Sequence, residues 1–146
     1  MFIDHETIRI TRNGDWLSNG EPITHESTLQ AYQYHLGRDT EGYFIQIGKD
    51  FKRVEVEDTA FFVRQIRFEG DRIHIQLSHG GEEPLDVQTL KYSPGRLVCR
   101  LLGRVEEAKF LAQPYHELLL RAELKAGHYV LPSGLGGVTL ASSDVT

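Results

Sequence analysis

Histidine is the side chain best able to bind a metal or move a proton near neutral pH, and this chain has seven. None of them falls in an HxxxH, HxH or CxxC…H arrangement. His74 and His79 come closest along one predicted strand, but a spacing of five residues puts them on opposite faces of a regular strand. We therefore expect dispersed surface or hydrogen-bonded histidines and no metal, while a carboxylate-histidine site built from distant segments stays open as the alternative.

Cys99 is the only cysteine, so the chain forms no intramolecular disulfide. It lies in an apolar run over residues 97–102, where a packed core thiol is favoured over an activated nucleophile. No Gly-x-Ser-x-Gly motif occurs, and Ser133-Gly134 lacks the strand-to-helix context of a nucleophile elbow.

The stretch Gly134-Leu135-Gly136-Gly137 is rich in glycine, and the amides of such a backbone can cradle a phosphate. It has no Walker lysine, and no helical pattern follows it. A plain turn is the favoured interpretation, with an anion or nucleotide contact as the alternative.

Two adjacent carboxylates, Glu57 and Asp58, would point to opposite faces of a strand and so do not form a glycosidase pair. Asp58 is better explained as a cap of the turn at Thr59-Ala60. Trp16 is expected in the core, because tryptophan buries a large area, with an exposed stacking surface as the alternative.

The first part of the chain predicts strands around one helix. Alternating residues 8–11 lead into Asn13-Gly14, a strong hairpin signal. Thr24 is a suitable N-cap for a helix that Gly37 would end. A second hairpin is expected over residues 43–56, turning at Gly48-Lys49-Asp50.

The second part predicts more strands and one further helix. Residues 61–68 and 72–77 suit a hairpin, residues 79–84 a loop, and residues 85–92 another strand. Pro114 fits the first position of a helix that Gly127 would stop.

The bulk properties narrow the class of protein. A chain of 146 residues suits one domain or two small halves, and its formal net charge of −5 argues against binding a nucleic-acid backbone. The start shows no signal-peptide pattern, and no run approaches the roughly 18 apolar residues of a membrane span. A cytoplasmic location is expected.

Several short motifs occur in an order that resembles a bacterial family, domain of unknown function 1285. The motifs span nearly the whole chain and are residues 10–16, 20–23, 39–43, 56–61, 115–118 and 133–140. The resemblance implies a duplicated fold whose second half is similar to pleckstrin-homology domains. It also implies a cleft between the halves for a nucleotide-like ligand and a role in signal transduction.

These observations lead to one set of expectations. The fold is α+β, with bent antiparallel sheets, an N-terminal β-α-β half over residues 1–58 and a C-terminal β-rich half with one helix over residues 59–146, similar to a pleckstrin-homology barrel. The expected function is a non-catalytic ligand-binding or signalling module without a cofactor; the alternatives are a hydrolase of small phosphorylated compounds and a protein-interaction module, including a homo-oligomer. The family's cleft suggests six ligand-binding positions, namely Trp16, Lys49, Arg53, Glu57, Asp58 and Phe61.

Overall fold

A computed structural model describes residues 6–142 of the chain. The chain divides into two compact units, Met1–Ala60 (unit 1) and Phe61–Thr146 (unit 2). Each unit has one α-helix and a mixed β-sheet, which confirms the α+β class. Within the described residues, neither helix is long and apolar enough to cross a membrane.

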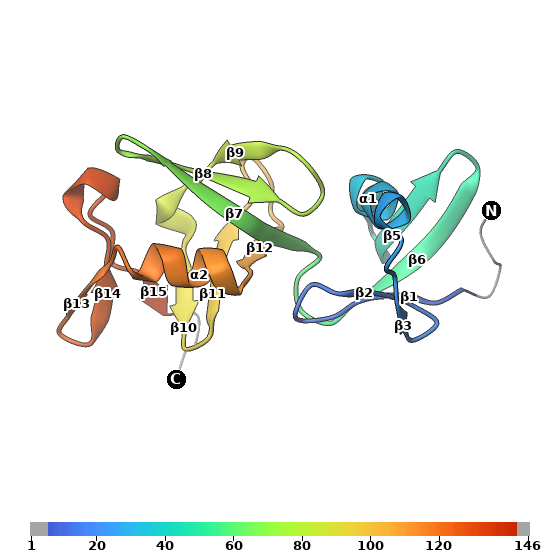
Figure 1. Ribbon diagram of the computed structural model, residues 1–146, viewed down its shortest axis with the longest axis horizontal. Coiled ribbons are helices and arrows are strands. Elements are labelled where there is room, and N and C mark those ends of the chain that lie inside the picture. The colour runs from blue at the N-terminus through green and yellow to red at the C-terminus, as the bar shows by residue number, and fades with distance from the viewer. Residues whose placement is uncertain (1–5, 143–146) are drawn as a thin grey trace. The chain divides into compact units, whose positions relative to one another are not determined.

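Unit 1 contains a six-stranded sheet in the order β3-β2-β1-β6-β5-β4 (Figure 1). Its strands are Ile8–Ile10 (β1), Trp16–Ser18 (β2), Glu21–Pro22 (β3), Leu36–Asp39 (β4), Gly42–Ile47 (β5) and Asp50–Val56 (β6). The predicted hairpins β1–β2 and β5–β6 are confirmed. However, β1 also runs parallel to β6, so the sheet is mixed and the expected antiparallel sheet is wrong.

Alternation along β6 decides what each face of this sheet carries. Val54 is buried, whereas Phe51 and Arg53 are not, because successive side chains of a strand point to opposite faces. On β1, Ile8 and Ile10 are buried in the same way. Period-two patterning therefore gives the sheet one face in the core and one in water.

The helix of unit 1, α1, covers Glu26–Tyr34 and differs from the prediction at both ends. His25 is the N-cap rather than Thr24, and its Nδ1 accepts a hydrogen bond from the Thr28 amide at 3.3 Å. Gly37 does not end the helix but pairs with Phe44 between β4 and β5. The sheet pairing therefore overrides the helical spacing of the sequence here.

Unit 2 contains a seven-stranded sheet in the order β15-β10-β11-β12-β7-β8-β9 (Figure 1). Its strands are Phe61–Glu69 (β7), Arg72–Leu77 (β8), Glu82–Pro84 (β9), Lys91–Ser93 (β10), Arg96–Arg100 (β11), Glu107–Phe110 (β12) and Ala141–Ser142 (β15). Parallel pairing of β12 with β7 makes this sheet mixed as well. Within the described residues the end strands β15 and β9 do not pair, so the sheet is open and the expected barrel is not formed.

The helix of unit 2, α2, covers Ala112–Leu119 and contacts β7 and β12. It ends well before Gly127, because the next residues form a hairpin of Glu123–Lys125 (β13) and His128–Val130 (β14). The turn of this hairpin has positive φ at Ala126 and Gly127, the geometry of a tight hairpin turn.

Two smaller predictions for unit 2 are also wrong. The expected loop at residues 79–84 contains β9, which pairs with β8. The expected strand over residues 85–92 is a short 3₁₀ helix, η1 (Val87–Thr89), followed by β10. Here the Asp86 side chain accepts a hydrogen bond from the Gln88 amide and so caps the start of η1.

Candidate functional site

The exposed face of the β5–β6 hairpin in unit 1 gathers aromatic and charged side chains. The register places Phe44 directly opposite Arg53 and Gln46 opposite Phe51. The rings of Phe44 and Phe51 stack with their centroids 5.2 Å apart. The guanidinium carbon of Arg53 lies 5.0 Å from the centroid of Phe51 and 5.9 Å from that of Phe44, within cation–π range.

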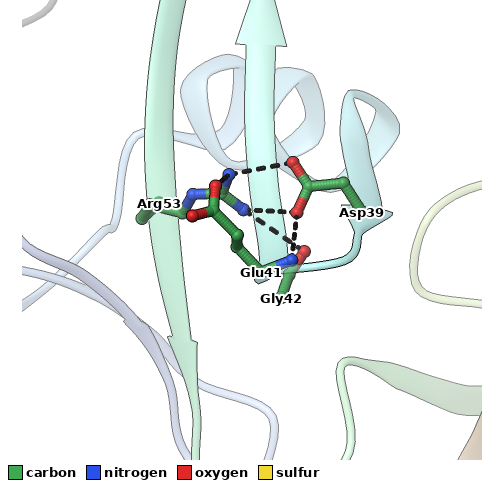
Figure 2. A network of polar contacts seen from close by, with 4 residues as sticks. All are labelled: Asp39, Glu41, Gly42 and Arg53. Carbon is green, nitrogen blue, oxygen red and sulfur yellow. Dashed lines mark hydrogen bonds and ion pairs between the residues drawn. The ribbon is translucent and has the colours of Figure 1, made fainter.

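Arg53 is held in place by two carboxylates from the β4–β5 turn, as Figure 2 shows. Its Nη1 donates to Asp39 Oδ1 at 2.7 Å, and its Nη2 donates to Asp39 Oδ2 at 2.8 Å and to Glu41 Oε2 at 3.0 Å. The Asp39 carboxylate also accepts from the Glu41 amide at 2.9 Å. The hydrogen bonds from Arg53 are the main reason why the pKa of Asp39 lies below its usual value. Arg53 is thus neutralised and positioned.

A glycine on β4 allows the ring of Phe44 to lie close to the backbone of that strand. A Cβ added to Gly37 would lie 2.8 Å from Cζ of Phe44, so any side chain there would displace the ring. Phe51 next to it stays 46% exposed. Unit 1 therefore presents an ordered aromatic surface to solvent.

Beside this surface lies a hollow of about 610 Å³ along the first half of β6. Eight residues line it: Glu6, Thr7, Lys49, Asp50, Phe51, Lys52, Arg53 and Glu55. Apart from Glu55, the residues of β6 that line the hollow precede the stretch from Val54 to Val56 that pairs with β1.

The three cations of the hollow differ in their partners. Nζ of Lys52 lies 3.7 Å from the Glu6 carboxylate, and these side chains are only 6% and 9% exposed. Arg53 is neutralised by Asp39 and Glu41. Lys49, at the hairpin turn, is exposed and forms no ion pair with any residue that the structure describes. Lys49 is therefore the cation available to an added anion.

The sequence-predicted positions fall into different environments. Lys49 and Arg53 line the same hollow. Trp16 is buried in the core of unit 1, with its ring centroid 6.3 Å from that of Tyr32. This confirms the core role that its size predicts.

The remaining three predicted positions lie at or beyond the end of β6. Glu57 accepts a hydrogen bond from the Arg12 amide at 3.0 Å. Asp58 lies in the turn that follows. Phe61 is buried in unit 2, where its ring centroid is 4.7 Å from that of His79 and 4.9 Å from the guanidinium carbon of Arg104.

Sequence reasoning missed the partners that organise Arg53, namely Asp39, Glu41 and Phe44. The predicted turn at Gly48-Lys49-Asp50 could have placed Phe44 opposite Arg53, because a hairpin turn fixes the register. No comparable signal marks Asp39 and Glu41, which reach Arg53 only because β4 is a strand.

Of the side chains considered for catalysis, Cys99 is the one whose predicted core position the structure tests directly. Cys99 is fully buried, and burial raises the pKa of its thiol to about 12, so it is a core residue rather than a thiolate nucleophile. Across residues 6–142, histidine, cysteine and carboxylate side chains form no group of three or more that could hold a metal ion.

The fold and this surface define a two-unit α+β protein with an aromatic, cation-bearing hollow. No protein-family model matches the chain. No curated protein matches it either.

Two solved structures match its fold. A DUF1285 family protein from Shewanella baltica OS155 aligns with a TM-score of 0.64 at 18% identity, covering 92% of this chain and 100% of that one. Another from Silicibacter pomeroyi DSS-3 aligns with a TM-score of 0.67 at 17% identity, covering 93% of this chain and 80% of that one. The predicted resemblance to this family is confirmed at the level of the fold.

Proposed function

We propose that this chain is a non-catalytic ligand-binding or signalling module of the cytoplasm, and that unit 1 takes a nucleotide-like small molecule in the hollow along β6. The proposal rests mainly on one observation: an exposed aromatic ring, Phe51, and a cation without an ion-pair partner among the described residues, Lys49, line the same hollow.

The chemistry of the two groups fits the two ends of such a ligand. An exposed aromatic ring offers a stacking surface for a base, and such stacking contributes about 1–3 kcal/mol per base. A lysine ammonium binds phosphate as a point charge. Arg53, fixed by Asp39 and Glu41, keeps the Phe44–Phe51 surface ordered before the ligand arrives, which lowers the entropic cost of binding.

The charge of the hollow favours a ligand with few negative charges. Three carboxylates line it together with three cations, and Glu6 already pairs with Lys52. A nucleoside monophosphate or a cyclic nucleotide is therefore a better fit than a triphosphate. Trp16, Glu57, Asp58 and Phe61 stay predictions as ligand contacts, and so does the signalling role that the family resemblance implies.

A thermal-shift screen of the full chain against AMP, cyclic AMP, cyclic GMP, ATP and NAD tests the proposal. A ligand at 100 times its Kd stabilises the native state by about 2.7 kcal/mol, which raises Tm by several degrees in a domain of this size. Lys49→Ala should lose the shift. Lys125→Ala, an exposed lysine of unit 2 whose ion pair is with Glu123 on the same strand, should keep it.

Two outcomes would count against the proposal. One is a shift of equal size in Lys49→Ala and the unchanged protein. The other is no shift with any of these nucleotides, which would direct the search toward a protein partner.

A further inference from the structure

Unit 2 has a hollow of its own, of about 490 Å³. Six residues line it: Gly70, Asp71, Arg121, Pro132, Gly134 and Leu135. They come from three segments, namely the turn between β7 and β8, the residues after α2, and a short 3₁₀ helix, η2 (Ser133–Leu135). Because distant parts of the chain converge here, the hollow is a product of the fold of unit 2.

Arg121 is ordered in this hollow but not neutralised. Its guanidinium carbon lies 3.7 Å from the ring centroid of Phe68. Stacking on a ring leaves the N–H donors free, because they point outward in the guanidinium plane. Within residues 6–142 no carboxylate forms an ion pair with Arg121, whereas Arg67 of the same unit binds Glu69 at 2.9 Å and Glu82 at 2.7 Å.

The hollow also holds one acid without an ion-pair partner. Asp71 lines it from the β7–β8 turn and, among the described residues, pairs neither with Arg121 nor with any other cation. Pro132 and Leu135 add apolar surface. One cation, one anion and an apolar surface match a ligand with the complementary charges and an apolar group. An inorganic phosphate or a phosphate ester would instead meet the negative charge of Asp71.

Two glycines of the stretch over residues 134–137 differ in whether the packing around them requires a glycine. Gly136 has φ of +108°, and a Cβ there would lie 2.9 Å from Cγ2 of Val87, so this glycine is needed for the packing of η2. A Cβ on Gly134 would meet nothing within 4 Å. Packing therefore does not require a glycine at position 134, and the space beside it in the hollow is open.

We propose that unit 2 binds a small zwitterion of the type of a free apolar amino acid, with its carboxylate on Arg121, its ammonium on Asp71 and its side chain against Pro132 and Leu135. This site differs in place and in charge pattern from the hollow of unit 1. It does not depend on a nucleotide-like ligand binding there.

Calorimetric titration of the full chain with four probes tests this proposal. L-Leucine carries both charges, 4-methylpentanoate lacks the ammonium, leucinamide lacks the carboxylate, and inorganic phosphate is the competing anion. L-Leucine should bind most tightly. Arg121→Gln and Asp71→Asn should each weaken it by about tenfold, since each removes a charge-assisted hydrogen bond. Asp71→Asn should not weaken the binding of 4-methylpentanoate, because this probe has no ammonium for Asp71 to bind and is relieved of a like charge.

Two further variants separate loss of the site from loss of the fold. Gly134→Val should abolish leucine binding by filling the hollow while Tm stays unchanged, because open space surrounds the position. Arg64→Gln, an exposed arginine on β7 outside the hollow, should bind leucine as the unchanged protein does.

The proposal is overturned if L-leucine shows no binding at about 10 mM, a concentration that detects even a millimolar Kd. It is equally overturned if Arg121→Gln binds leucine as tightly as the unchanged protein. Tighter binding of phosphate than of leucine would show an anion site instead.

Discussion

Lys52 and Arg53 are neighbours on β6, and each forms an ion pair on a different face of the same sheet. On the inner face, Lys52 lies 3.7 Å from Glu6, and the two side chains are 6% and 9% exposed. On the outer face, Arg53 lies 2.7 Å from Asp39, and both side chains are 40% exposed. The outer pair has the shorter distance, but the inner pair is the one shielded from water.

Burial matters more than distance for the role of each pair. A charge removed from water becomes costly when it loses its partner, whereas an exposed charge is solvated and screened after its partner is gone. The Glu6 carboxylate also raises the pKa of Tyr32, after the larger effect of burial of that side chain, and accepts a hydrogen bond from Ser18 at 2.5 Å. The inner face is therefore structural, while residues of the outer face can be changed without unfolding unit 1.

The largest effect should come from breaking the inner pair. Lys52→Met leaves the Glu6 carboxylate buried without its lysine, and we expect the free energy of unfolding to fall by about 3 kcal/mol in urea titrations. The double variant Lys52→Met with Glu6→Gln should recover most of this loss, because no buried charge remains. A single variant within about 0.5 kcal/mol of the unchanged protein would contradict the structural role of the pair.

A smaller effect should follow from disturbing the aromatic surface of the outer face. Gly37→Ala pushes against the ring of Phe44, and overpacking of this kind should cost about 1 kcal/mol of unfolding free energy. Gly134→Ala is the matched control, since its added Cβ meets open space and φ there is not in the left-handed region. Equal stabilities for the two alanine variants would show that the ring of Phe44 yields without cost.

Much of the sheet of unit 1 could be predicted from the sequence, because hairpins depend on neighbouring residues. The turn at Gly48-Lys49-Asp50 and the alternation of β5 and β6 were sufficient to place Lys49 at the turn. The parallel pairing of β1 with β6 was not predictable in the same way, since it joins residues more than forty positions apart that no single tight turn connects.

The contacts of the candidate site in unit 1 were predictable only in part. Leu36 and Gly37 continue the helical spacing of the sequence, yet they form β4 because pairing with β5 wins over local preference. Once β4 exists, Asp39 and Glu41 reach Arg53. The family resemblance thus suggested Arg53, while its neutralised state depends on strand pairing that local patterns do not encode.

The pH dependence of Tm should reflect the ion pair between Arg53 and Asp39. Arg53 lowers the pKa of Asp39, so the carboxylate stabilises the native state above the unfolded pKa of about 4, and this contribution is lost as the pH falls through the lower native pKa. The difference in Tm between the unchanged protein and Asp39→Asn should therefore be constant near neutral pH and shrink below about pH 4. A difference that does not change with pH would show that Asp39 contributes nothing through its charge.

The smallest change in stability should come from Lys49→Ala, the variant that should abolish ligand binding in the hollow of unit 1. Lys49→Ala removes an exposed side chain that forms no ion pair with any described residue, so the free energy of unfolding should stay within about 0.5 kcal/mol of its original value. Urea titration of the two proteins checks this. A larger loss would mean that Lys49 supports the fold, and its use as a binding probe would fail.

The most direct test of the hollow along β6 as a ligand site is an NMR titration of the full chain with AMP and with cyclic AMP, following the backbone amides. We predict saturable shifts of the amides of residues 48–55, around Lys49 and Phe51, that disappear in Lys49→Ala. Shifts confined to other parts of the chain, or the same shifts in Lys49→Ala, would contradict the assignment of this hollow as the nucleotide-like site.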